Sequence, residues 1–152
     1  MYPERLILRN FLSFEELDYT FTKQTLGVTG ENRTEEDQLS NGSGKSSLSQ
    51  GLFYAIYGVN LRGKEDKKLI RKGTKEAYTK VEIFCQKRKE TLIIERTIPL
   101  KSSSKVSLTL KKDDVETPVT VVTVLDANKY VINWIEITPV SYTHLRAHET
   151  VL

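Results

Sequence analysis

The feature that most constrains this chain is a short glycine-rich segment between a strand-like run and a helical one. The segment reads Asn-Gly-Ser-Gly-Lys-Ser-Ser and occupies residues 41–47. An apolar run at residues 25–29 precedes it. A stripe with helical spacing follows it, formed by Leu48, Leu52, Ala55 and Ile56, and Gly58 then supplies a helix stop. We therefore expect a strand–loop–helix unit whose helix begins near Lys45.

A glycine-rich loop in this context is suited to binding phosphate. Glycines allow successive backbone N–H groups to close around an anion, and the following helix directs its positive N-terminus to the same place. In the pattern G-x-x-x-x-G-K-[ST] the lysine reaches the β- and γ-phosphates and the hydroxyl coordinates Mg²⁺. The ligand is expected to be ATP or GTP, with Ser46 as the Mg²⁺ ligand. The predicted nucleotide-binding residues are Asn41, Gly42, Ser43, Gly44, Lys45, Ser46 and Ser47.

The segment departs from the general pattern at one position. Leu39 stands where the first glycine is expected, and the glycine that ends the preceding strand is Gly30. The residues 33–40 are polar and acidic apart from Leu39, and we interpret them as an insertion in the loop. Such insertions are tolerated because closure entropy grows only logarithmically with loop length. The alternative is a flexible Gly-Ser-Gly linker, but the strand and helix patterns on its flanks favour a phosphate loop.

Further motifs resemble one family of ATPases. The chain contains, in order, Leu-Ile-Leu-Arg-Asn-Phe-Leu-Ser-Phe at 6–14, Leu-Phe-Tyr-Ala-Ile-Tyr-Gly at 52–58 and Leu-Ile-Arg-Lys-Gly at 69–73. Two strand-like runs follow at 81–84 and 92–96, the second ending in an Ile-x-Arg signature. Together with the phosphate loop, this series is similar to the SbcC / Rad-fifty group of DNA-repair ATPases, which are relatives of the SMC proteins.

The resemblance implies a fold, cofactors and partners. The fold would be α/β: a P-loop NTPase, namely the N-terminal lobe of an ABC-type ATPase head with an antiparallel β-rich portion. The lobe would be incomplete, because the Walker B, signature and glutamine-loop motifs of such heads lie downstream of the region present. The implied cofactors are ATP and Mg²⁺. The implied partners are DNA, a nuclease subunit and a second head, which forms a homodimer around ATP.

The resemblance also suggests contacts outside the loop. Asn10 and Ser13 match positions that hold nucleotide in this group, whereas Leu12 replaces a frequent arginine. The stretch after the first helix often contacts the base, which makes Arg62, Gly63 and Lys64 further candidates for nucleotide contact. No catalytic residue is expected in this chain, because hydrolysis requires the downstream motifs. By itself the chain is expected to bind nucleotide weakly at best and to hydrolyse none.

Composition bounds the remaining possibilities. A chain of 152 residues is long enough for one modest domain with its own core. The net charge is only +3, but residues 62–75 contain seven lysines and arginines against Glu65 and Asp66. This stretch is either a contact for nucleotide or DNA phosphates or a solvated loop. The lack of a signal peptide or membrane-spanning run, and the single Cys85, predict a cytoplasmic protein without a membrane partner.

The second half of the chain reads mainly as strands and one helix. Residues 87–90 are expected to form a charged hairpin tip, and alternating apolar residues predict a strand over 106–110. A β-rich run at 115–124 is interrupted by Pro118. Asp126 is predicted to cap a helix that buries Ala127, Tyr130, Val131, Trp134 and Ile135.

The last residues need separate treatment. Residues 140–150 resemble a translated transposase adapter of the kind used in sequencing libraries. The expected division is therefore a lobe at 1–139 and a non-native tail at 140–152, which is excluded from fold reasoning. The tail holds both histidines, His144 and His148. No third ligand accompanies them, so zinc binding is not predicted.

Three other classes of protein remain as alternatives. An SMC-like DNA clamp ATPase would share the same lobe, and a zinc-hook Cys-x-x-Cys or a glycine-rich hinge elsewhere in the protein would separate the two. A small P-loop kinase usually has its loop after the first strand and helical lid segments beyond it, whereas β-like runs follow the loop here. An ABC transporter subunit is disfavoured by the Arg-Asn-Phe opening and the Ile-Arg-x-Gly motif.

Overall fold

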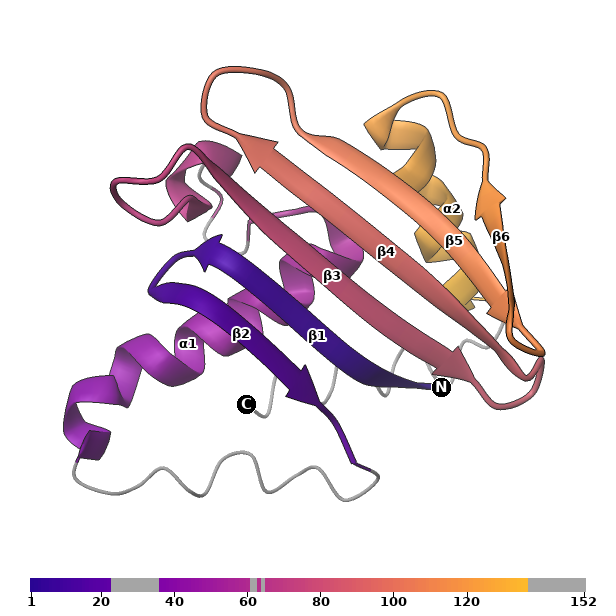
Figure 1. The fold of residues 1–152 in the computed structure, drawn as a ribbon, viewed down its shortest axis with the longest axis horizontal. Helices are drawn as coiled ribbons and strands as arrows, with labels where there is room; N and C mark the ends of the chain where they lie inside the picture. Colours follow the sequence, from indigo (N-terminus) through magenta and orange to yellow (C-terminus); the bar gives the residue numbers. More distant parts are fainter. Residues whose placement is uncertain (23–35, 61–62, 64, 137–152) are drawn as a thin grey trace.

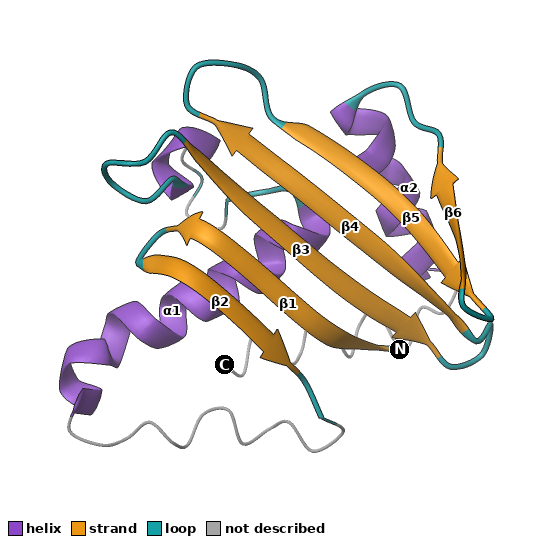
Figure 2. Cartoon of the chain, viewed as in Figure 1, coloured by secondary structure: helices purple, strands orange, loops and turns teal. Residues whose placement is uncertain are grey.

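Residues 76–85 alternate between buried and less buried side chains, as expected of a strand that packs one face of a sheet against a core. The computed structural model describes residues 1–22, 36–60, 63 and 65–136, with the backbone alone for 36–46 and 136. The strands in these ranges form one antiparallel sheet in the order β2-β1-β3-β4-β5-β6 (Figures 1 and 2). Their bounds are β1 Tyr2–Phe11, β2 Phe14–Thr20, β3 Glu76–Cys85, β4 Glu90–Pro99, β5 Lys105–Lys112 and β6 Val115–Val119.

The register of the strands aligns the core in rows. Leu6 pairs with Val81, Val81 with Ile94, and Ile94 with Leu108, so that four buried aliphatic residues cross the sheet side by side. The neighbouring row on the other face pairs Lys80 with Glu95. The β3–β4 pair confirms the antiparallel pair that the sequence predicts at 81–84 and 92–96.

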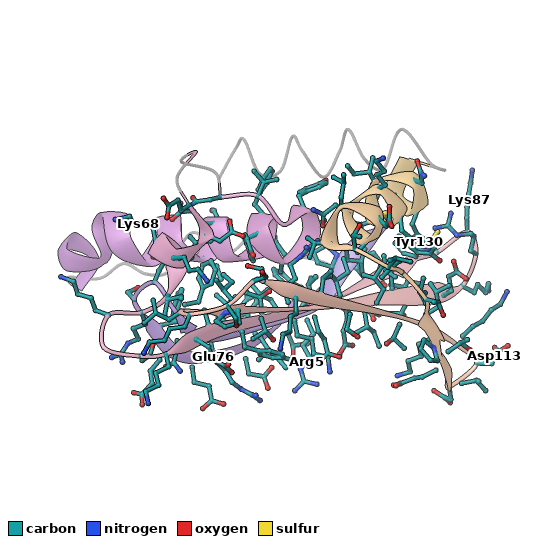
Figure 3. The ribbon with its side chains drawn as sticks, turned by 90° about the horizontal axis from the view of Figure 1, so that it is seen from above. Arg5, Lys68, Glu76, Lys87, Asp113 and Tyr130 are labelled. Atoms are coloured by element: carbon teal, nitrogen blue, oxygen red, sulfur yellow. The ribbon has the colours of Figure 1, made fainter. Side chains whose placement is uncertain are left out.

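Both long helices, α1 (Glu36–Tyr57) and α2 (Val124–Glu136), lie on the same face of the sheet. Figure 3 shows them on one side, with Arg5 and Glu76 on the other. Helix α1 contacts β1, β3 and β4, and α2 contacts β5 and α1. A short 3₁₀ helix, η3 (Asp66–Leu69), follows α1. None of the described helices is long and apolar enough to span a membrane.

Helix α2 carries the predicted apolar face but begins earlier than predicted. Ala127, Val131, Trp134 and Ile135 are buried, whereas Tyr130 is only half-buried at the edge of the core. The predicted N-cap at Asp126 is wrong. The Thr123 hydroxyl accepts a hydrogen bond from the Asp126 backbone N–H at 3.1 Å, so Thr123 is the capping residue. Its oxygen reaches the amide three residues ahead, as an N-cap requires.

Helix α1 also begins earlier than predicted, at Glu36 rather than near Lys45. Glu36 and Asp37 are the first two residues of the helix as described. The helix therefore includes residues 36–40 of the predicted insertion as well as residues 41–47. The predicted strand at 25–29, the start of the insertion and the tail at 140–152 lie outside the described residues.

Candidate nucleotide-binding site

Two predicted site residues that are distant in sequence meet in the structure. Ser13, in the turn between β1 and β2, donates a hydrogen bond through Oγ to Ser47 Oγ at 3.5 Å. Ser47 is buried on α1. The two positions are 34 residues apart in sequence. The structure thus brings the end of the glycine-rich segment against the β1–β2 turn.

Gly51 allows α1 to approach the sheet at this point. A side chain at Gly51 would lie 2.6 Å from Leu8 Cδ1, far inside van der Waals contact. Leu8 is fully buried on β1, three residues before Phe11, the last residue of that strand. Because Gly51, one turn after Ser47, has no side chain, this part of α1 can lie close to β1.

The β1–β2 turn is held in an unusual backbone conformation. Asn10 and Leu12 have positive φ angles of 50° and 51°, a region that a branched side chain such as leucine rarely occupies. Two hydrogen bonds keep the turn in place. Asn10 O accepts one from the Arg71 amide, and the Leu12 amide donates the other to Leu69 O, both at 2.8 Å. The backbone of Leu69 and Arg71, in the Leu-Ile-Arg-Lys-Gly segment at 69–73, thus braces Asn10 at the end of β1 and the turn that carries Ser13.

The structure describes the remaining predicted nucleotide-binding residues only in part. Asn41, Gly42, Ser43 and Gly44 have helical backbone, so their N–H groups point along the helix toward carbonyls of the preceding turn. They do not form a loop around an anion in this structure, which differs from the predicted cradle. The side chains of Lys45 and Ser46 lie outside what is described, as do Arg62 and Lys64. Gly63 is exposed, with φ 69°, and donates its amide to Asn60 O.

Arg96 is a buried residue that sequence reasoning did not assign to the site. It lies on the inner face of β4, 2% exposed. Its Nε donates to Ala55 O at 3.0 Å and its Nη2 to Ile56 O at 2.9 Å, in the last turn of α1. Burial lowers the pKa of this guanidinium to about 10, so it stays protonated at neutral pH. The alternation of β4, with Leu92 and Ile94 facing inward, is the signal that places Arg96 in the core.

A basic surface lies beside the β1–β2 turn. We define it as Lys67, Lys68, Arg71, Lys72, Lys75 and Lys101. Its two segments are joined by Lys67, which donates to Pro99 O and Ser102 O, and by the Leu100 amide, which donates to Lys75 O. Lys68, Lys72, Lys75 and Lys101 are exposed, and Figure 3 shows Lys68 at the η3 end of the molecule.

Tyr54 ties the basic surface to α1. Its hydroxyl donates to Asp66 Oδ2 at 3.1 Å, at the start of η3. Burial, followed by the charge of Asp66, raises the pKa of the Tyr54 hydroxyl. The helix with the glycine-rich segment, the braced turn and the basic surface therefore form one connected region.

This antiparallel β-rich sheet, with helices on one face, has the fold of the P-loop NTPase-like N-terminal lobes of SMC and RecF ATPase heads. A solved structure from work on ATP-driven dimerization and DNA-stimulated activation of SMC ATPases has a TM-score of 0.58 at 19% identity. It covers 88% of this chain and 76% of that one. A RecF–ATP structure has a TM-score of 0.52 at 14% identity, covering 76% of this chain and 28% of RecF.

A family model described as an AAA domain matches residues 5–138, and the chain belongs to this family. The DNA replication and repair protein RecF of Carboxydothermus hydrogenoformans is 32% identical over 98 residues, which are 64% of this chain and 25% of RecF. The DNA double-strand break repair Rad50 ATPase of Thermoplasma volcanium is 31% identical over 104 residues. Those residues are 68% of this chain and 10% of that ATPase. These matches confirm the resemblance drawn from the sequence motifs, and the chain spans a quarter or less of both relatives.

Proposed function

We propose that the chain is the nucleotide-binding lobe of a DNA-repair ATPase of the SbcC / Rad50 type, which binds ATP and Mg²⁺ through residues 41–47. The observation that carries this proposal is the contact between Ser13 and Ser47. The sequence points to each residue for a separate reason, Ser13 through the family resemblance and Ser47 through the glycine-rich segment, and the fold brings them together. The similarity to RecF and to a Rad50 ATPase supports the same assignment.

The residues of the glycine-rich segment are chemically suited to bind a nucleoside triphosphate. Lys45 would neutralise phosphate charge, the Ser46 hydroxyl would take Mg²⁺, and the amides of the glycine-rich segment would donate to phosphate oxygens. For this, α1 must unwind as far as Lys45. Unwinding is inexpensive because each of Gly42 and Gly44 is about 1 kcal/mol less favourable than alanine inside a helix. The bound Mg²⁺ would supply charge neutralisation at the phosphates, and no residue of this chain is proposed as catalytic.

The basic surface is proposed to contact the DNA backbone. Four of its side chains are exposed, and Lys67 holds the two segments together. Lysines and arginines on one surface bind phosphates without sequence preference. In the whole protein, two such lobes would form a homodimer around ATP and control a nuclease subunit at DNA double-strand breaks.

Equilibrium dialysis of radiolabelled ATP with Mg²⁺ tests the nucleotide site. Lys45→Ala is expected to weaken binding at least about tenfold, because a charge-assisted contact to phosphate is lost. Lys112→Ala removes an exposed lysine at the far end of β5 and serves as the control; it should bind as the native chain does. Equal affinity in all three proteins would overturn the proposal.

A salt-dependent gel-shift assay with duplex DNA tests the basic surface. A Lys68→Glu, Lys72→Glu double variant is expected to lose most DNA binding and to reduce the dependence of affinity on salt. Lys87→Glu with Lys89→Glu changes the same charge at the β3–β4 hairpin tip, where both residues are exposed. Loss of binding in the second pair but not in the first would contradict the assignment.

A further inference from the structure

Three elements of the fold meet at the guanidinium of Arg96. Its Nε and Nη2 donate to Ala55 O and Ile56 O at the C-terminal end of α1. Its Nη1 donates to Asn128 Oδ1 on α2 at 2.8 Å. Arg96 itself belongs to β4. One side chain therefore joins the helix of the proposed nucleotide site, the second helix and the centre of the sheet.

These three acceptors are neutral oxygens. The buried positive charge therefore depends on well-aligned hydrogen bonds to them. The Ala55 and Ile56 carbonyls belong to the negative end of the α1 dipole, which offsets part of the cost of removing the guanidinium from water. A displacement of α1 would take these carbonyls away from a buried cation. Arg96 must therefore move with the end of α1 or lose its partners.

Gly58 shows how closely the elements fit. It has a φ of 73°, and a side chain there would lie 2.5 Å from Arg96 Nη1 and 3.0 Å from Asn128 Oδ1. Gly58, the residue that follows α1, thus lies close to both members of the Arg96–Asn128 pair. A side chain at this position would fit only if Arg96 or Asn128 moved.

The far end of α2 carries a natural reporter of its position. Trp134 is the single tryptophan of the chain. Its Nε1 donates to Glu90 Oε2 at 2.8 Å, and the Arg88 guanidinium carbon lies 4.7 Å from its ring centroid. A movement of α2 relative to the β3–β4 hairpin would change both contacts and hence the tryptophan emission.

We propose that Arg96 is a positioning residue that couples α1 to α2 through Asn128, so that a displacement of the nucleotide-binding helix reaches the second helix. The coupling itself depends only on the contacts of Arg96. The claim that bound nucleotide acts through this coupling rests on the proposed function. Through this link, ATP bound at residues 41–47 of α1 would alter the environment of Trp134 at the opposite end of α2 from Asn128.

Hydrogen exchange without nucleotide tests the coupling directly. Asn128→Ala removes the acceptor on α2 while favouring helix, and Asn128→Asp keeps an oxygen in the same place and strengthens the bond. In Asn128→Ala, amides in the last turn of α1 are expected to exchange about tenfold faster along with those of α2. In Asn128→Asp they should exchange no faster than in the native chain. Faster exchange confined to α2 would overturn the coupling, because a merely local role predicts that result.

Titration with ATP and Mg²⁺ tests whether nucleotide uses the link. Bound nucleotide is measured by dialysis and Trp134 emission is recorded on the same samples. The native chain and Asn128→Asp are expected to change emission on binding, and Asn128→Ala to bind ATP with the emission change lost. Binding without an emission change in the native chain, or an unaltered change in Asn128→Ala, would overturn the link to nucleotide. If no ATP binds, the proposed function fails, and the exchange experiment alone decides the coupling.

Discussion

Ser13 Oγ lies 3.5 Å from Ser47 Oγ, in a contact that closes the β1–β2 turn onto α1. Asn10, at the end of β1, and Ser13, in the turn, are two of the residues that the sequence assigns to nucleotide, and α1 carries residues 41–47. The turn is also braced from behind by the backbone of Leu69 and Arg71. The phosphate-binding segment and the family's opening motif are therefore parts of one structural unit.

The Ser13→Ala variant tests whether Ser13 contributes to ATP binding rather than to the stability of the fold. A single long hydroxyl contact contributes at most about 1 kcal/mol to stability, so the urea midpoint is expected to stay close to the native value. ATP affinity is expected to fall several-fold, because the hydroxyl faces the segment that would hold the phosphates. Ser107→Ala, on the exposed side of β5, is the control. Equal ATP affinity in both variants would remove Ser13 from the site.

Two glycines test the junction at Arg96. Gly58 and Gly73 both have positive φ angles, 73° and 85°, but only Gly58 has close neighbours; nothing lies within 4 Å of a side chain built at Gly73. Gly73→Ala is expected to cost about 1–2 kcal/mol of unfolding free energy from backbone strain alone. Gly58→Ala should cost about 1–3 kcal/mol more, because the methyl group would collide with Arg96 and Asn128. Chemical denaturation of the two variants measures the difference, and equal costs would mean that the junction can relax.

The raised pKa of the Tyr54 hydroxyl predicts that the protein loses stability at alkaline pH. Its pKa is raised in the folded protein by burial and by Asp66, so the folded state keeps this proton where the unfolded chain releases it. The stabilisation is complete below the ordinary tyrosine pKa of about 10 and is lost as pH rises above it. Urea midpoints measured between about pH 9 and pH 11 should fall less steeply for Tyr54→Phe than for the native chain. Parallel slopes would show that Tyr54 ionises freely.

Much of the fold follows from local sequence patterns. The alternation in β3 and β4 predicts their pairing, and the stripe of Leu52, Ala55 and Ile56 predicts a helix against the sheet. These patterns are sufficient because the periods of strand and helix fix which side chains share a face. They also explain why the family resemblance leads to the correct fold class.

The differences arise where several local choices compete or where partners are distant in sequence. The sequence predicts that α1 begins near Lys45, whereas it begins at Glu36, because a polar stretch with acidic residues is compatible with either a loop or a first helical turn. Thr123 and Asp126 are both good capping residues, and only the backbone geometry selects Thr123. Arg96 contacts Ala55, 41 residues away, and no local pattern reveals such a partner for a buried cation.

The most direct test of the central claim is hydrogen exchange at the amides of residues 41–47 with and without ATP and Mg²⁺. If these amides close around the phosphates, their exchange is expected to slow at least about tenfold on binding. The Lys45→Ala variant, at the same nucleotide concentration, should show little slowing. Unchanged exchange at these amides in a native chain shown by dialysis to be saturated with ATP would contradict the account, because the nucleotide would then be bound elsewhere.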